Sequence, residues 1–437
     1  MTRKYKVYRR ILIIALIINI LGIGVTAYVQ LLHKIPDDLR IVVNENELIN
    51  LSLKTGGIFG EIFKEKEDME ESIGVLSVNN QKLDEDSIKL NLNKPFSMQS
   101  SGTGSYTIKV KLLGIIDLKE IQVDVIEDRQ LIPCGMPIGI SIRTNGVLVL
   151  GTGVITGRDG LNYEPALNIL KTGDYILEAN GRTIDDKSTL MDEVQKARGS
   201  QVDLTVKRED EVMHLNITPV TDSSGDYKIG AWIRDDTQGI GTLTYMDEEG
   251  CFGALGHGIT DIDTGVLMDI KEGNIYKANI LQIIKGKAGT PGEIVGVINK
   301  SQSSYYGDVN KNTRQGIFGQ FTEQMKEKIE GQALPIGLKQ GVKTGKAQIM
   351  CQLRDKVETY DIEIEKIEWN TSNASKGMVI HITDEKLLDK TNGIIQGMSG
   401  SPIIQDGKII GAVTHVFVQD STRGYGIFIE NMLHASR

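Results

Sequence analysis

The chain has 437 residues, a formal net charge of −9 at pH 7, 40% hydrophobic residues and 24% charged residues. This length predicts two or three domains, and the composition is that of a globular protein rather than a disordered one. The negative charge and the lack of a basic stripe with interleaved aromatics exclude nucleic acid as an expected partner. Cys134, Cys251 and Cys351 form no CxxC pair, so we expect no zinc framework, no other metal and no cofactor.

The N-terminus is predicted to cross a membrane. Residues 1–10 carry five basic residues and no acid, and residues 11–29 form an uncharged apolar run. About 20 apolar residues span a bilayer as a helix, and the flanking positive charge places the N-terminus in the cytoplasm. We therefore expect a signal-anchor with the bulk of the chain outside the cytoplasm. A cleaved signal peptide, with Val25-Thr26-Ala27 as the cleavage site, is the open alternative.

Residues 30–130 are predicted to form a small β-rich module. Tyr106–Leu112 and Ile121–Val125 alternate apolar and polar residues, as half-buried strands do. No catalytic pattern occurs here, so we interpret the module as a spacer or docking element.

Residues 131–220 resemble a PDZ domain. The resemblance is carried by residues 170–184 (LKTGDYILEANGRTI), which contain an Asn-Gly hairpin, and by a predicted helix after them. In that family a short loop offers backbone N–H groups to a peptide carboxylate, and an extended peptide adds to the sheet edge. The resemblance implies that Ile138, Gly139 and Ile140 form this loop and that Leu190 lines the side-chain pocket. The alternative for Leu190 is packing in the core.

Residues 221–437 are predicted to form a chymotrypsin-like double β-barrel, because they contain many short strands and Gly-rich turns. Gly397–Pro402 (GMSGSP) places Ser399 between glycines, and Gly253–Gly258 (GALGHG) places His257 142 positions earlier. This order matches enzymes in which base and nucleophile come from successive barrels. The predicted fold is thus mainly β, with five consecutive parts: a cytoplasmic segment 1–10, a transmembrane signal-anchor 11–29, a β-rich module 30–130, a PDZ-like domain 131–220 and a serine peptidase domain 221–437.

Three segments together resemble one family. They are Trp232–Leu243, Gly253–Gly265 (GALGHGITDIDTG) and Gly397–Pro402. With the PDZ-like domain and the membrane span before them, they resemble the SpoIVB peptidases, serine peptidases of endospore formation. The resemblance implies an exported enzyme in the forespore intermembrane space. It also implies a substrate protein at the membrane that regulates an intramembrane metalloprotease, in a pathway that activates a late sigma factor.

Ser399 is the candidate nucleophile, and its weakly nucleophilic hydroxyl needs a base within hydrogen-bond reach. His257 is the candidate base, because imidazole titrates near neutrality and can take and return a proton. The glycines around Ser399 allow a tight backbone that aims amide N–H groups at one point. We expect the N–H groups of Gly397 and Ser399 to form the oxyanion hole.

The third member of the site has several candidates. The resemblance assigns it to Asp384, which stands 15 positions before the nucleophile. Chymotrypsin-like enzymes instead place the acid between the two barrels, which leaves Asp261, Asp263 and Asp308 as alternatives. An Asp in this role fixes the tautomer of the histidine and stabilises the imidazolium.

Two other functions stay open at this point. The first is a non-catalytic PDZ scaffold with a degenerate barrel that only binds peptides. The second is a Cys–His hydrolase that uses Cys251 or Cys351. For the peptidase we also expect self-cleavage between about Lys34 and Lys66, because the tether holds this linker at high effective concentration.

Overall fold

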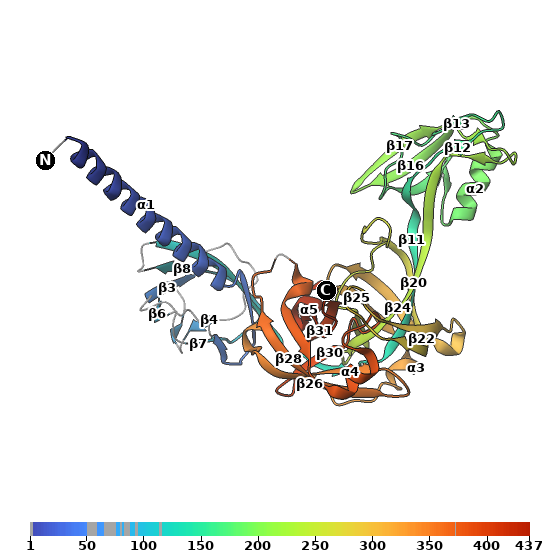
Figure 1. The fold of residues 1–437 in the computed structure, drawn as a ribbon. Coiled ribbons are helices and arrows are strands. Elements are labelled where there is room, and N and C mark those ends of the chain that lie inside the picture. The colour runs from blue at the N-terminus through green and yellow to red at the C-terminus, as the bar shows by residue number, and fades with distance from the viewer. Residues whose placement is uncertain are drawn as a thin grey trace. The chain divides into compact units, whose positions relative to one another are not determined.

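The computed structural model describes residues 3–49, 59–64, 76–78, 81–82, 88–91, 95–112, 116–371 and 373–437. It divides into two compact units (Figure 1). The first unit contains residues 1–129 with two short later segments, 336–343 and 367–372, and the second contains the rest. Strands dominate both units, which confirms the mainly β fold predicted from the sequence.

The N-terminal segment is a single helix, α1 (Arg3–Lys34). Its segment Val7–Gln30 has a mean hydropathy of 2.5 and is not buried against the rest of the structure. The segment is long and apolar enough to cross a membrane. The helix also meets the description of a signal sequence near an N-terminus. The length and composition of this helix therefore fit both the predicted membrane span and a signal sequence.

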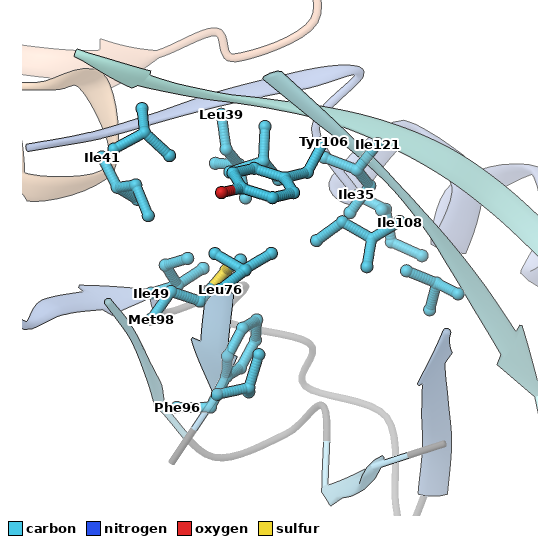
Figure 2. Packing of buried hydrophobic residues seen from close by; sticks show 14 of the residues in the cluster. Ile35, Leu39, Ile41, Ile49, Leu76, Phe96, Met98, Tyr106, Ile108 and Ile121 are labelled. Carbon is cyan, nitrogen blue, oxygen red and sulfur yellow. The ribbon is translucent and has the colours of Figure 1, made fainter. Parts of the chain in front are cut away.

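Two sheets enclose the core of the first unit. Its five-stranded sheet has the order β1-β9-β8-β3-β6, and its four-stranded sheet has the order β2-β7-β4-β5. The bounds in chain order are β1 (Asp38–Val42), β2 (Glu47–Ile49), β3 (Phe59–Lys64), β4 (Leu76–Val78), β5 (Gln81–Lys82), β6 (Ile88–Asn91), β7 (Phe96–Ser100), β8 (Gly104–Leu112) and β9 (Ile116–Ile126). Figure 2 shows side chains of both sheets meeting in the core, with Leu39 and Tyr106 facing Leu76 and Met98.

The two later segments of the first unit are bound to strand β1 and the residues just before it. The buried Lys339 pairs through Nζ with Asp38 Oδ1 at 2.7 Å, and Gln340 Nε2 donates to the carbonyl of Arg40 at 2.6 Å. Asn370 Nδ2 donates to the carbonyl of Ile35 at 2.7 Å. The module predicted at 30–130 therefore also contains residues more than 200 positions further along the chain.

The second unit begins with a closed ring of six antiparallel strands. Its order is β11-β22-β24-β25-β21-β20, and β20 pairs back with β11. The bounds are β11 (Pro137–Thr152), β20 (Ala231–Met246), β21 (Cys251–Ala254), β22 (Ile270–Ile284), β24 (Tyr305–Thr313) and β25 (Gly316–Phe321). Ile138, Ile140 and Ile142 alternate along β11 and point into this barrel's core. Each such buried side chain contributes roughly 1.5–3 kcal/mol of hydrophobic stabilisation.

The PDZ part is an insertion into this first barrel. Strands β11 and β20 continue beyond the barrel and pair again, with Val149 opposite Ile233 (Figure 1). Between them lie, in chain order, β12 (Ile155–Thr156), β13 (Asn162–Tyr163), β14 (Tyr175–Ala179), β15 (Arg182–Thr183), α2 (Lys187–Lys196), β16 (Val202–Arg208), β17 (Glu211–Ile217), β18 (Val220–Thr221) and β19 (Tyr227–Lys228). The predicted boundary at residue 131 thus differs from the structure, because residues 137–144 belong to the first barrel.

The second barrel is a closed sheet with the order β27-β28-β29-β32-β31-β30. Its strands are β27 (Gly345–Gln352), β28 (Val357–Ile367), β29 (Met378–Ile382), β30 (Pro402–Gln405), β31 (Lys408–Val416) and β32 (Arg423–Phe428). The remaining elements of the chain are β10 (Gln130–Pro133), β23 (Glu293–Ile298), η1 (Gln302–Ser304), α3 (Glu323–Lys326), β26 (Leu334–Pro335), η2 (Lys339–Gly341), η3 (Ala374–Lys376), α4 (Glu385–Thr391) and α5 (Ile429–Ser436). Two successive barrels are the architecture that the order of His257 and Ser399 predicts.

The structure corrects the peptide-binding prediction for Ile138, Gly139 and Ile140. These residues lie in β11, where Gly139 is opposite Tyr276 of β22 on one side and Ile240 of β20 on the other. A strand with partners on both sides has no free edge for a peptide. Alternating apolar residues around a glycine are compatible with a barrel strand and with a PDZ loop, so the local sequence does not distinguish these two structures.

This placement predicts the effect of a single methyl group. A Cβ at Gly139 would lie 2.6 Å from the side chain of Ile298, so Gly139→Ala is expected to destabilise the barrel by about 1–3 kcal/mol through overpacking. Gly239, which is opposite Ile140 on β20, has open space around its Cβ position. Gly239→Ala is therefore a matched control that should unfold at or above the wild-type temperature. Equal thermal unfolding of Gly139→Ala and wild type would contradict this placement.

Candidate active site

The nucleophile turn lies between α4 and β30. Gly397 and Gly400 flank Met398 and Ser399 and have φ values of 99° and 98°, a region that residues with a Cβ rarely adopt. A Cβ at Gly400 would also overlap the carbonyl oxygen of Thr242 on β20. Both glycines are therefore required by geometry, one of them by direct contact with the first barrel.

The turn leaves two backbone donors free. The N–H groups of Met398, Gly400 and Ser401 donate to backbone carbonyls at 3.1, 2.8 and 2.9 Å. The N–H groups of Gly397 and Ser399 donate to no acceptor in the part of the chain that the structure describes. Most buried or partly buried amides are paired, so two free donors on alternate residues fit a site for a developing oxyanion.

The Ser399 side chain is partly exposed and held by the neighbouring strand. Its Oγ donates to the carbonyl of Thr414 on β31 at 2.6 Å. Thr414 is itself buried, and its own hydroxyl donates to the carbonyl of Ser375 at 2.7 Å. Ser399 is therefore partly accessible, and its hydroxyl points toward the strand segment that also carries His415.

His257 follows β21 through two residues in the left-handed region. Leu255 and Gly256 have φ values of 70° and 69°, and Leu255 adopts this conformation at a cost of roughly 1–2 kcal/mol. A Cβ at Gly256 would lie 2.9 Å from methyl groups of Thr414 and Ile427. This glycine therefore lets the end of β21 approach the second barrel closely enough to place His257 beside the same strand segment.

The imidazole of His257 lies in a defined environment. Its Nδ1 is 2.9 Å from the carbonyl of Gly258, so Nδ1 carries the proton and Nε2 keeps its lone pair. The ring centroid lies 4.9 Å from that of His415. Burial lowers the pKa of His257 below its usual value, against a smaller opposing effect of the Gly258 carbonyl. Partial removal from water, together with His257 and Lys376, lowers the pKa of His415 to about 4.

Asp384 is the N-cap of α4 in this structure. Its Oδ1 accepts from the N–H groups of Lys386 and Leu387 at 2.9 and 3.0 Å, and its Oδ2 accepts from the N–H of Asp361 at 3.3 Å. Within the described ranges, no carboxylate lies within ion-pair distance of His257. The structure therefore brings Ser399 and His257 to the same segment of β31. The carboxylate of Asp384 binds backbone N–H groups and not His257.

The other three candidate acids also have their own partners. Asp261 is buried and forms an ion pair with Arg234, which also binds Asp263 at 2.7 Å. Asp308 accepts a hydrogen bond from Tyr305. Two of these three bind an arginine and the third a tyrosine hydroxyl, and in the described ranges none forms a hydrogen bond or ion pair with His257.

Cys134 and Cys351 do not form a thiolate site. Burial raises the pKa of Cys134 and of Cys351 to about 12, far above the range of reactive thiols. Cys251 Sγ donates to Gln320 Oε1 at 3.1 Å. In the described parts of the chain, no three His, Cys, Asp or Glu side chains gather as a metal site requires.

Leu190 belongs to the core of the PDZ part, where it lies on α2 with Val194 among buried residues of β14 and β16. It therefore does not line a peptide pocket as predicted.

The PDZ part has a free strand edge on β20. In the ranges that the structure describes, residues 231–241 of β20 pair only with β11, and α2 packs against β20. Asp235 on this strand accepts the N–H of Lys187 at the start of α2 at 2.8 Å. A free edge beside a helix is the place where PDZ domains add a peptide strand.

Comparison with known proteins agrees with this architecture. Residues 225–433 match the family model described as SpoIVB peptidase S55, and residues 160–218 match the model of a PDZ domain. Residues 225–433 therefore form a SpoIVB-type peptidase domain, and residues 160–218 form a PDZ domain. The chain has no match among curated proteins.

Two solved structures are similar to parts of the chain. One is the PDZ domain of the SdrC-like protein from Listeria monocytogenes, with 24% identity over 20% of this chain and 87% of that chain and a TM-score of 0.16. The other is the inactive form of the Rv3671c protease, with 10% identity over 45% of this chain and 82% of that chain and a TM-score of 0.26.

Sequence reasoning missed two contributors to the site. The carbonyl of Gly258 is the partner of His257 Nδ1, and no side-chain pattern indicates a main-chain partner. Thr242 contacts the nucleophile turn, although it lies 157 positions before Ser399. Its segment, Gly239–Leu243, contributes to the family resemblance, but the sequence assigns no role to the threonine.

The lowered pKa of His257 predicts a pH dependence. A base works only when it is unprotonated, so activity should be lost as the pH falls through the pKa of His257. Because that pKa lies below the usual value of about 6.5, the midpoint of the acid limb should also lie below about 6.5. The measurement is the rate of Ser399 labelling by a fluorophosphonate between pH 4 and 9, roughly the range over which a histidine and its neighbours titrate.

The His415→Gln variant is the control for this pH profile. It should keep the acid limb, because His415, with a pKa of about 4, is neutral over most of this range in the wild type. Loss of the limb in that variant would identify His415, and not His257, as the base.

Proposed function

We propose that this chain is an exported, membrane-tethered serine endopeptidase in which Ser399 is the nucleophile and His257 the general base. The observation that supports this most is the convergence of three elements at Thr414 and His415 of β31. Ser399 is hydrogen-bonded to Thr414, the ring of His257 lies against that of His415, and the free N–H groups of Gly397 and Ser399 lie in the same turn.

The reaction follows from these groups. When a substrate carbonyl arrives, the Ser399 hydroxyl turns from Thr414 to His257 Nε2, which takes its proton as Oγ attacks the carbonyl carbon. The N–H groups of Gly397 and Ser399 stabilise the negative oxygen that forms. The protonated His257 then gives its proton to the leaving amine, and a water molecule activated by the same histidine hydrolyses the acyl-enzyme. Before the substrate arrives, the Gly258 carbonyl binds Nδ1–H.

Asp384 completes the proposal as the acid, in line with the family resemblance. Its carboxylate lies at the start of α4, the helix that leads directly into the nucleophile turn. Catalytic hydrogen bonds in enzymes without substrate are often unformed and tighten in the substrate complex. The negative charge of Asp384 would favour the imidazolium that forms during the reaction.

The proposed biological setting rests on the resemblance to the SpoIVB peptidases and on the apolar N-terminal helix. We place the N-terminus in the cytoplasm and the peptidase outside it, in the forespore intermembrane space. The substrate is a regulatory protein at that membrane, in the sporulation pathway that activates a late sigma factor. The free edge of β20 beside α2 would bind an extended segment or chain end of such a partner, and the exposed Trp232 on this strand offers an apolar contact.

Self-cleavage remains part of this proposal, with a narrower location. Ile35 and most of β1 are buried in the first unit, so cleavage there requires that unit to open. The expected loop Lys54–Gly57 and the acidic run after it lie outside the described residues. We therefore propose the part of the predicted range that follows β2, up to about Lys66, and not β1, as the segment for self-cleavage.

Ser399→Ala tests the nucleophile. The variant should lose about 10⁴- to 10⁶-fold in peptide-bond cleavage, because the attacking oxygen is gone, while its thermal unfolding stays close to that of wild type. Ser401→Ala is the matched control, since the buried Ser401 hydroxyl has no hydrogen-bond partner in the described part of the chain. Cleavage of a fluorogenic casein that survives Ser399→Ala would overturn the proposed site. No cleavage by wild type and no labelling would favour the peptide-binding scaffold.

Two substitutions of Asp384 separate its structural and chemical roles. Asn caps helices as well as Asp does, so Asp384→Asn should unfold near the wild-type temperature, whereas Asp384→Ala should lose about 1 kcal/mol. The proposed acid role predicts that Asp384→Asn still loses about 10³- to 10⁴-fold in turnover. Wild-type turnover in Asp384→Asn would instead assign the orientation of His257 to the Gly258 carbonyl alone.

A further inference from the structure

Thr242 connects the two turns that carry the site. It is 3% exposed, near the barrel end of β20. Its hydroxyl donates to the carbonyl of Gly397 at 2.7 Å, and its N–H donates to the carbonyl of Ser399 at 2.9 Å. Its own carbonyl accepts from the N–H of Leu255 at 3.2 Å, in the turn that leads to His257.

These hydrogen bonds fix the peptide planes next to the free donors. A trans peptide unit is planar, with its C=O and N–H pointing in opposite directions, so a bound carbonyl also fixes the direction of the N–H that follows. The Gly397 carbonyl shares a plane with the Met398 N–H, and the Ser399 carbonyl shares a plane with the Gly400 N–H. Thr242 therefore anchors the units on either side of the Ser399 N–H.

The anchor is needed because the turn is made of residues that rotate easily. Gly397 has no Cβ, and its positive φ gives it access to alternative backbone orientations. Rotation of the Gly397–Met398 unit would turn its carbonyl toward the site and tilt the neighbouring donors away. The Thr242 hydroxyl is the side-chain group that holds this carbonyl among the residues that the structure describes.

We propose that Thr242 is a positioning residue that holds the oxyanion-binding turn in its productive conformation. The inference rests on the proposed peptidase function and adds to it a residue of the first barrel. Thr242 acts through the backbone of the turn and does not touch the substrate.

The same strand supplies a matched control. Thr244 is fully buried two residues further along β20, and its hydroxyl has no hydrogen-bond partner in the described parts of the chain. Replacement of either threonine by valine removes one hydroxyl from a buried position and keeps the shape. Only the change at Thr242 removes a hydrogen bond to the nucleophile turn.

The experiment compares the full-length wild type, Thr242→Val, Thr242→Ser and Thr244→Val. The probe is a fluorophosphonate, whose phosphonyl oxygen occupies the oxyanion position as the reagent bonds to Ser399 and loses fluoride. Loss of one direct oxyanion donor costs about 10²- to 10³-fold in rate. We expect a smaller loss, about 10- to 100-fold, in the second-order labelling rate of Thr242→Val, because the donors remain but are less well held.

The remaining variants decide between positioning and general stability. Thr242→Ser keeps the hydroxyl and should label within about threefold of wild type, as should Thr244→Val. For a cleaved protein substrate, Thr242→Val should lower kcat with KM nearly unchanged. Wild-type labelling by Thr242→Val, an equal loss in Thr244→Val, or failure of Thr242→Ser to restore the rate would overturn the proposal. If wild type itself does not label at Ser399, the proposed function fails first.

Discussion

The active site depends on two reciprocal contacts between the barrels of the second unit. Gly256 of the first barrel packs against Thr414 of the second, and Gly400 of the second packs against Thr242 of the first. A Cβ at either glycine would meet the facing threonine, so neither position accepts a larger residue without a shift. Because His257 follows one glycine and Ser399 precedes the other, these contacts set the distance between the proposed base and the proposed nucleophile. Rigid strands on both sides give the precision that catalysis requires.

The PDZ part is built into this frame rather than attached to it by a linker. Strand β11 runs from the first barrel into the PDZ sheet, and β20 runs from the PDZ sheet back into the first barrel. Ion pairs also connect the PDZ part to the segment after His257: Arg234 binds Asp261 and Asp263, and Lys207 binds Asp269 at 2.7 Å. A peptide on the free edge of β20 would therefore add to a strand that continues into the first barrel, eleven residues or fewer before Thr242.

The sequence predicts those residues of the candidate active site whose chemistry requires a rare local sequence pattern. Glycines around Ser399 and before His257 are needed for left-handed backbone and close approach, so they mark both residues without any knowledge of the fold. The barrel strand at 137–144 could not be found in this way, because its partners on β22 lie more than 120 positions away. The segments around Lys339 and Asn370 were missed for the same reason, since their partners near β1 are even more distant in sequence. Asp384 is ambiguous because an Asp before a short helix is a cap as readily as a catalytic acid.

We propose that the turn of Ser399, held by the first barrel, forms the oxyanion site opposite His257. A crystal structure of the protein after reaction with a fluorophosphonate tests it most directly. We expect phosphorus bonded to Ser399 Oγ and the phosphonyl oxygen about 2.7–3.1 Å from the backbone nitrogens of Gly397 and Ser399. His257 should lie beside the adduct, and both Thr242 hydrogen bonds should be retained. An adduct on another residue, or a phosphonyl oxygen that faces solvent with Gly397 rotated away, would contradict it.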